Sequence, residues 1–295
     1  MRLKQTTCLA LFLIVCGSSA ASAGFLDQLQ KLADPESKER KMLSGATQVL
    51  SSAKDMDYPT ERAIGESLAL EGLQRFGLPV KDEALQQYVN QVGNAVAANS
   101  KRPTIPYRFA VLESNVQNAF AVPGGVIFIS KELLGVIDNE AELAAVLAHE
   151  VGHVASKHAI SSIRRAQFLQ GVGTISAAQM KGDKGKQFES MIGDLQSVLF
   201  DKGLDKSMEF EADSAALESS YRSGYDPRGM ITVLKKLKKL EASSVKKGSW
   251  FSTHPALDDR IERLEAQLKN YPDAASLATV PERFAKRVKL SGAKN

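Results

Sequence analysis

The stretch Glu140-Ala-Glu-Leu-Ala-Ala-Val-Leu-Ala-His-Glu-Val-Gly-His153 decides both the fold and the chemistry of this chain. Asn139 precedes it and Glu142 follows three residues later, an arrangement like a capping box that predicts the start of a helix. Apolar residues cover a broad face of that helix, so we expect it to be central and buried. The stretch ends in a His-Glu-x-x-His sequence at residues 149–153.

The spacing of the two histidines suits a metal site. At about 100° per residue, His149 and His153 lie on one helix face, a turn apart, so both imidazoles can reach one tetrahedral Zn²⁺ at about 2.0–2.1 Å. Glu150 is too far round the helix to be an easy ligand, but it can accept a proton from water at the metal. With 4 histidines in 295 residues, the pattern would arise by chance roughly 0.003 times. The alternative, two core histidines, would need hydrogen-bond partners that a metal supplies.

A catalytic zinc site needs a third protein ligand and an open fourth position. The best candidates come from the acidic segment Met-Glu-Phe-Glu-Ala-Asp at residues 208–213. Glu209 and Asp213 are four residues apart and share a helix face. One carboxylate can bind the metal, and the other can accept the remaining N–H of a ligand histidine. Taken alone, the segment would be interpreted as a solvated acidic face, but the neighbouring His-Glu-x-x-His sequence reverses that preference.

Two further polar residues are expected to lie outside the metal site. His158 is five residues after His153, about 140° round a continuous helix, so it should point elsewhere and make a local hydrogen bond. Glu211 lies between the two candidate acids and should point away from their face.

Five segments, in this order, resemble the HtpX/Oma/CAAX-prenyl-protease family of gluzincin metallopeptidases. They are Asn118–Gly125 (NAFAVPGG), Glu140–His153, Glu209–Asp213 (EFEAD), Gly224–Pro227 (GYDP) and Thr253–Pro255 (THP). The resemblance covers roughly residues 60–268. It implies an α+β, mostly helical, zincin-like domain with one small β-sheet beside the active-site helix, and endopeptidase activity. It also implies that Glu209 is the third ligand and that Asp213 supports a ligand histidine from behind.

The same resemblance implies roles for His254 and Arg260. A histidine in the Thr-His-Pro context lies over the metal in relatives, either as a removable fourth ligand or as a donor to the tetrahedral oxyanion. An arginine six residues later can assist that stabilisation. Judged from the residues alone, both would be exposed surface side chains.

Two short segments predict strands. Residues 107–112 alternate in the way that is typical of a strand. The second segment, Val126, Ile127, Phe128 and Ile129, follows a Pro-Gly-Gly turn. We expect residues 126–129 to bind the substrate as an added strand at a sheet edge. A plain core strand is the alternative, and the two roles are compatible.

The remaining chain is divided by pattern. Residues 1–23 carry a basic start, an apolar run and an Ala-Ser-Ala end, which predicts a secretory signal peptide. The alternative is a lipoprotein cleavage before Cys16, although Val15 stands where such sites have a small residue. An N-terminal segment at 24–58, the metallopeptidase domain at 59–270 and a C-terminal tail at 271–295 would follow. Helices are expected at 59–77, after Asp82, and at 207–221, 227–241 and 257–268, with loops at 181–186 and 243–254.

Composition excludes some partners and favours one compartment. Both cysteines lie within residues 1–23, so the mature chain would have no disulfide. Loss of Arg2 and Lys4 lowers the net charge from +4 to +2, which offers no electrostatic argument for nucleic acid. The basic run at 235–239 is interpreted as a solvated helix face. No apolar run is long enough to span a bilayer, so the chain resembles the soluble periplasmic branch, and association with the envelope membrane is compatible with this.

These patterns lead to one main hypothesis and two rivals. The main hypothesis is a zinc endopeptidase, with one Zn²⁺ per chain, that hydrolyses misfolded or unassembled envelope proteins. A rival is a zinc-bound chaperone or assembly factor whose fourth metal position is permanently closed. A second rival is a helical interaction domain without metal.

Overall fold

The computed structural model describes residues 57–162, 192–241 and 249–292. The predicted signal peptide, Cys16, nearly all of the segment at 24–58 and the predicted loop at 181–186 lie outside the described residues. The architecture is mostly helical with one small sheet, which confirms the predicted fold class.

A three-stranded sheet lies at the centre of the fold. Its strands are β1 (Arg108–Leu112), β2 (Ala119–Val122) and β3 (Val126–Ser130), in the order β1-β3-β2. Strand β3 runs parallel to β1 and antiparallel to β2. Gly124 and Gly125, with φ of 85° and 101°, make the tight turn between β2 and β3, a backbone conformation that a side chain would strain.

The position of β3 corrects one prediction. Val126, Ile127, Phe128 and Ile129 were expected to bind substrate at a sheet edge, but they form the central strand. Their backbone pairs with β1 on one side and with β2 on the other. Since both sides carry a neighbouring strand, no further strand can add there. The edge strand that packs against the helix carrying His149 and His153 is β2 instead.

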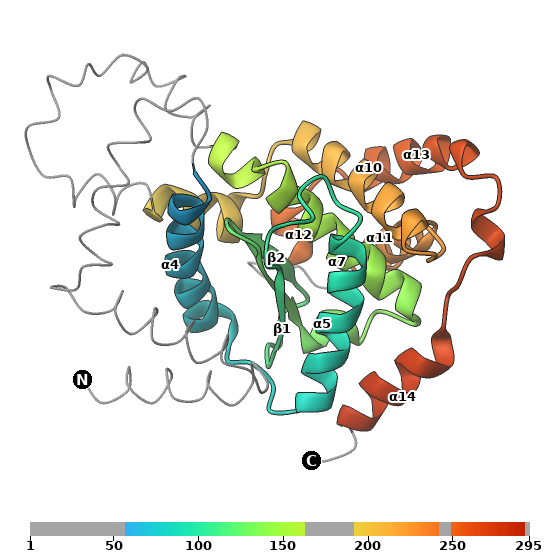
Figure 1. Ribbon diagram of the computed structural model, residues 1–295, viewed down its shortest axis with the longest axis horizontal. Coiled ribbons are helices and arrows are strands. Elements are labelled where there is room, and N and C mark those ends of the chain that lie inside the picture. The colour runs from blue at the N-terminus through green and yellow to red at the C-terminus, as the bar shows by residue number, and fades with distance from the viewer. Residues whose placement is uncertain (1–56, 163–191, 242–248, 293–295) are drawn as a thin grey trace, which may run out of the picture.

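The two faces of the sheet support two separate apolar cores. Successive strand residues point to opposite faces, so Phe109 and Ile127 pack with α5 (Glu83–Ala97) and α7 (Glu140–Ala155). Phe120 and Phe128 pack on the other side with α4 (Tyr58–Phe76). Figure 1 shows this layering, with the sheet between α4 and the α5–α7 pair. Burial on both faces explains why the strands are almost continuously apolar.

Helix α7 forms the centre of the helical layer, and every residue from Glu140 to Val154 is buried. The predicted cap is confirmed, because the Asn139 side chain accepts a hydrogen bond from the Glu142 N–H at 3.0 Å. Helix α7 packs most extensively against α10 (Lys206–Arg222). A Cβ at Gly152 would lie 3.2 Å from the Ala212 Cα, so a side chain there would require α10 to shift by a few tenths of an ångström.

The other elements surround this pair of helices. They are α6 (Lys131–Leu134), η2 (Val198–Lys202), α11 (Gly229–Glu241), α12 (Trp250–Thr253), α13 (Leu257–Gln267), η3 (Leu268–Asn270), η4 (Ala274–Ser276) and α14 (Pro281–Gly292). Helix α12 corrects the predicted loop at 243–254, of which residues 243–248 lie outside the described part. This short turn forms because the Trp250 side chain is fully buried and the Trp250 backbone N–H donates to the Gln117 carbonyl at 2.8 Å.

The C-terminal residues also contain an element that the sequence patterns did not indicate. Helix α14 packs on α5 and α7, and its Phe284 is buried. The Arg283 guanidinium binds the Glu140 carboxylate at the first turn of α7. The tail predicted at 271–295 therefore includes a helix that is attached to the active-site helix.

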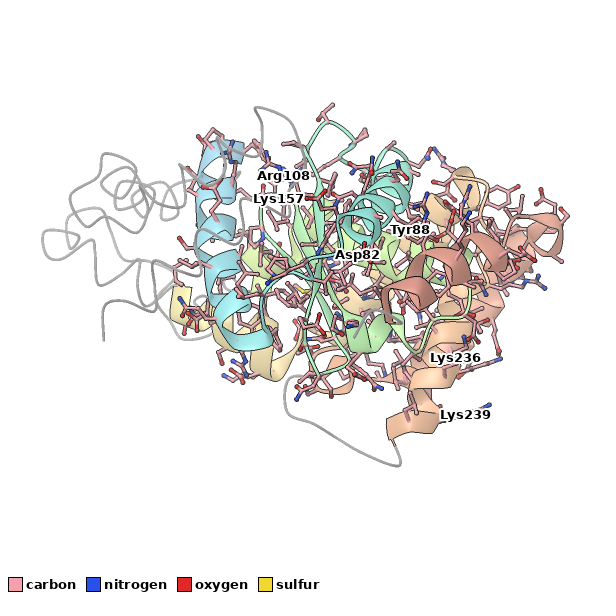
Figure 2. All side chains as sticks on the ribbon, turned by 90° about the horizontal axis from the view of Figure 1, so that it is seen from below. Asp82, Tyr88, Arg108, Lys157, Lys236 and Lys239 are labelled. Atoms are coloured by element: carbon pink, nitrogen blue, oxygen red, sulfur yellow. The ribbon has the colours of Figure 1, made fainter. Side chains whose placement is uncertain are left out.

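Three of the four lysines in the basic run on α11 pair with neighbouring acids. Lys235 pairs with Glu265 at 2.6 Å, and Lys236 pairs with Glu142 at 2.6 Å. Lys238 pairs with an aspartate of α13. In Figure 2, Lys236 and Lys239 lie along one helix, well separated from Lys157 and Arg108.

Across the described ranges, 57–162, 192–241 and 249–292, no helix combines the length and the hydropathy that crossing a bilayer requires.

Candidate metal centre

Three predicted ligands meet where α7 and α10 cross. The Nε2 atoms of His149 and His153 face each other at 3.0 Å. The Glu209 carboxylate completes the group, with Oε2 3.5 Å from His149 Nε2 and Oε1 3.6 Å from His153 Nε2. All three side chains are buried. His254 offers a fourth atom, and the four possible ligand atoms lie within 4.8 Å of one another.

These distances fit a divalent cation. Two ligand atoms that each lie about 2.0–2.1 Å from a tetrahedral Zn²⁺ are separated by about 3.3–3.4 Å, close to the spacings here. Both carboxylate oxygens of Glu209 are fully buried and make no hydrogen bond with the described residues, although Oε2 lies 3.0 Å from an Arg260 nitrogen. Buried carboxylate oxygens without hydrogen bonds are costly, and a bound cation at Oε1 and Oε2 would reduce that cost. Two imidazoles and one carboxylate are a ligand set that suits zinc.

Asp213 lies behind His149, as the sequence predicted. Its Oδ1 is 3.0 Å from His149 Nδ1, within reach of a hydrogen bond. Burial alone lowers the pKa of His149, but Asp213 and Glu209 beside it raise that pKa to about 9. This strong attraction between imidazole and carboxylate would orient the ring with Nε2 facing the other ligands.

Arg260 occupies a different place from the one predicted. Its guanidinium is fully buried and forms two hydrogen bonds with Asp213, from Nε at 2.8 Å and from Nη2 at 2.7 Å. The third nitrogen, Nη1, is 3.0 Å from Glu209 Oε2. Although burial raises the pKa of Asp213, the Arg260 charge brings it below the ordinary value.

The expected role of Arg260 as an oxyanion stabiliser is therefore wrong for this geometry. The side chain does not line the cleft described below, and its nitrogens are directed at the two acids. Arg260 instead neutralises and orients Glu209 and Asp213, because two buried acids side by side need a cation between them.

Glu150 and His254 lie on the open side of the metal ligands. Glu150 is 1% exposed, and its Oε1 has no hydrogen bond within the described part of the chain. His254 Nε2 lies 3.5 Å from that oxygen. The His254 ring stacks on Trp250 with ring centres 4.0 Å apart, and its Nδ1 is 2.9 Å from Thr253 Oγ1. This position suits either predicted role, as a fourth ligand or as a donor to an oxyanion.

A cleft opens beside these residues. Edge strand β2 and the turn after it line one wall, and η2 contributes apolar residues to the other. The cleft is lined by residues of both walls and of the candidate site, among them Phe120, Val122, Glu150, His153, Leu199 and His254. Glu150 and one candidate ligand, His153, therefore border the cleft.

One contact of His153 was missed by the sequence patterns. His158 was expected to point elsewhere, but its Nδ1 lies 2.9 Å from His153 Nδ1. Helix α7 ends at Ala155, and Lys157 follows with a φ of 54°. That left-handed residue interrupts the helix, so an angle counted along a continuous helix does not apply. Lysine is not a usual signal for this conformation, and nothing in the local sequence indicated it.

The comparisons with known proteins agree with this geometry. The model of the family described as peptidase family M48 matches residues 83–268. A β-barrel assembly-enhancing protease of Yersinia pestis is 32% identical over 212 residues, which are 67% of this chain and 42% of that protein. The mitochondrial metalloendopeptidase OMA1 of Schizosaccharomyces pombe is 28% identical, over 61% of this chain and 52% of that protein. The metalloprotease LoiP of Escherichia coli is 30% identical, over 60% of this chain and 68% of that protein. The chain spans less than half the length of the β-barrel assembly-enhancing proteases it matches.

Proposed function

This chain belongs to peptidase family M48 and is a metallopeptidase, and from this premise we propose that it is a zinc endopeptidase that hydrolyses misfolded or unassembled cell-envelope proteins. The proposal rests on an acid that lacks a hydrogen bond and lies beside a cluster of candidate metal ligands. Glu150 is buried, has a carboxylate oxygen without a hydrogen bond in the described structure, and borders the cleft beside His149, His153 and Glu209.

The residues of the site divide the chemistry among them. When bound, zinc polarises the scissile carbonyl and lowers the pKa of water towards about 7. The Glu150 carboxylate accepts a proton from the attacking water and passes it to the leaving amine nitrogen. His254, held by Trp250 and Thr253, donates a hydrogen bond to the oxyanion of the tetrahedral intermediate. Asp213 and Arg260 hold His149 and Glu209 in place from behind.

The substrate proposal rests on the edge strand and on the relatives. Among the described strands, β2 pairs on one side only, and its residues line the cleft. We propose that an extended substrate segment adds to this edge through main-chain hydrogen bonds, which demand little of its sequence. Such a segment is available in unfolded chains. Two relatives are named β-barrel assembly-enhancing proteases, which supports a cell-envelope substrate.

The proposed location follows from the sequence. Residues 1–23 have the pattern of a secretory signal peptide, so we propose that the chain acts in the periplasm. Its ion-paired lysines on α11 and its small net charge favour polypeptide partners over nucleic acid.

Replacement of Glu150 tests the mechanism. We expect purified Glu150→Gln to bind zinc as the parent does and to cleave unfolded casein about 10²–10⁴-fold more slowly, because the proton acceptor is lost. Zinc content is measured by elemental analysis, and cleavage by release of soluble peptides. Glu113→Gln is the matched control, since Glu113 is an exposed glutamate paired with Lys131. Retention of zinc together with the parent rate in Glu150→Gln would contradict the mechanism.

One observation favours a second candidate, a zinc-bound chaperone with a closed site. His254 lies close enough to act as a permanent fourth ligand, and fully closed tetrahedral sites are typically structural. This candidate predicts that the zinc-loaded parent cleaves no unfolded substrate yet suppresses aggregation of one. Light scattering of a denatured client, measured beside the casein assay, separates the two candidates.

A further inference from the structure

The two ligand histidines have different partners on the side away from the metal position. His149 Nδ1 faces the buried carboxylate of Asp213 at 3.0 Å. His153 Nδ1 faces another imidazole, that of His158, at 2.9 Å. The chain has 4 histidines, and His158 is the one that lies outside the group of possible metal ligands. It is 3% exposed, so water does not take the place of these contacts.

The hydrogen bonds of His158 continue to an acid on the neighbouring helix. Its Nε2 lies 3.3 Å from Glu211 Oε2. Glu211 is the acid expected to face away from Glu209 and Asp213, and it does so by facing this histidine. Its Oε1 accepts hydrogen bonds from Ser156 Oγ and Lys101 Nζ, both at 2.8 Å. These hydrogen bonds fix the Glu211 carboxylate in place, although the side chain is 46% exposed.

We propose that His158, held by Glu211, is a positioning residue that fixes the tautomer and the orientation of His153 as a metal ligand. The inference rests on the proposed function, because it concerns the ligand site of the proposed zinc peptidase. It adds a second support beside Asp213, one that the motif spacing did not predict.

The proton positions follow from the geometry. A neutral imidazole has one N–H and one lone pair. If His153 uses the lone pair of Nε2 for the metal, its proton must be on Nδ1, where it donates to His158 Nδ1. That bond requires a lone pair on His158 Nδ1, which places the His158 proton on Nε2, facing the Glu211 carboxylate. Each contact in this series thus has one donor and one acceptor, and the tautomer of both rings is determined.

Substitution of His158 by a residue without polar atoms should weaken metal binding. In the full-length protein, we expect His158→Leu to bind zinc about 10–100-fold more weakly, the usual effect of losing such a support. The dissociation constant is measured by competition with a chromophoric chelator. Binding of Co²⁺ to the same variant reports ligand geometry, and we expect a changed visible absorption spectrum.

His158→Gln is the variant that separates positioning from packing. Its amide oxygen can accept the His153 N–H and its amide nitrogen can donate to Glu211, so we expect it to recover most of the affinity that the leucine variant loses. Glu211→Gln should weaken zinc binding less than His158→Leu, because a neutral acceptor remains. Glu218→Gln is its matched control, an acid on the same helix that binds Arg222 and Tyr271 instead.

The outcomes distinguish this inference from the proposed function. Weaker zinc binding in His158→Leu that His158→Gln restores supports positioning. Parent affinity in His158→Leu, or an equal loss in both variants, overturns it while the zinc peptidase proposal stands. A parent protein that binds no zinc overturns both. Thermal melting of the metal-free proteins shows whether folding contributes, and equal affinity losses that merely follow melting temperature count against the inference.

Discussion

Each end of α7 carries an equally buried glutamate, but the two glutamates differ in how many hydrogen bonds their carboxylates accept. At the N-terminal end, Glu140 is 1% exposed, and its carboxylate accepts hydrogen bonds from Tyr88 at 2.9 Å and Tyr225 at 2.7 Å. The Arg283 guanidinium binds both of its oxygens. At the C-terminal end, Glu150 is also 1% exposed, yet one of its oxygens has no hydrogen bond within the described structure.

Hydrogen bonding, more than burial, separates a structural acid from a functional one here. The donors around Glu140 stabilise its charge and join α5, α14 and the segment between α10 and α11 to α7. Glu150 and Glu209 keep unused acceptor capacity that a cation, water or substrate can fill. Stability at one end therefore compensates for unsatisfied groups at the other, as functional sites commonly require.

The largest expected effect comes from making the same Glu-to-Gln substitution at an acid of each site, Glu140 and Glu209, and comparing the two variants. Glu140→Gln should lower the free energy of unfolding by about 3 kcal/mol, because a buried charged acceptor is lost, and leave zinc affinity unchanged. Glu209→Gln should lower the metal-free free energy of unfolding by less than Glu140→Gln does, because it loses one ion pair with Arg260, whose two hydrogen bonds to Asp213 remain. It should weaken zinc binding by more than about 100-fold. Urea unfolding in chelator and zinc titration measure the two properties. If both variants lose both properties alike, the distinction between the ends is wrong.

Metal removal should give a smaller effect confined to the C-terminal end. At free zinc of about 100 times its dissociation constant, binding adds about 2.7 kcal/mol to the free energy of unfolding, and a chelator removes it. Zinc should stabilise Glu140→Gln by as much as it stabilises the parent, whereas it should hardly stabilise Glu209→Gln. Unfolding curves with and without chelator test this. A zinc effect of equal size in Glu209→Gln would show that the metal binds elsewhere.

The smallest effect concerns acid pH. Burial raises the pKa of Glu140, but Arg283 and the two tyrosines bring it below the ordinary value of 4.5. Because the folded-state pKa is the lower one, ionised Glu140 stabilises the fold above pH 4.5, and this contribution is lost as pH falls through the folded-state pKa. In chelator, the parent should therefore lose more stability than Glu140→Gln between pH 5 and pH 3. Parallel pH profiles for the two proteins would contradict this assignment.

Elements with strong local patterns were predictable. The capped helix at 140–155, the helical segment with Glu209 and Asp213 on one face, and two of the three strands follow from spacing and turn residues, whereas strand β2 was not predicted. The ligand set His149, His153 and Glu209 followed from helix geometry together with the family resemblance. Helix α14 was missed, because its attachment depends on contacts of Phe284 and Arg283 with distant elements.

Sequence alone determined which side chains share a helix face, because the repeat of a helix sets the angle between residues a few positions apart. Relations between elements needed the tertiary structure. Packing made β3 a central strand, placed Arg260 between two buried acids, and used a left-handed Lys157 to return His158 to His153. None of these relations is encoded by local spacing, because each depends on which distant backbone approaches and on the turn that brings it there.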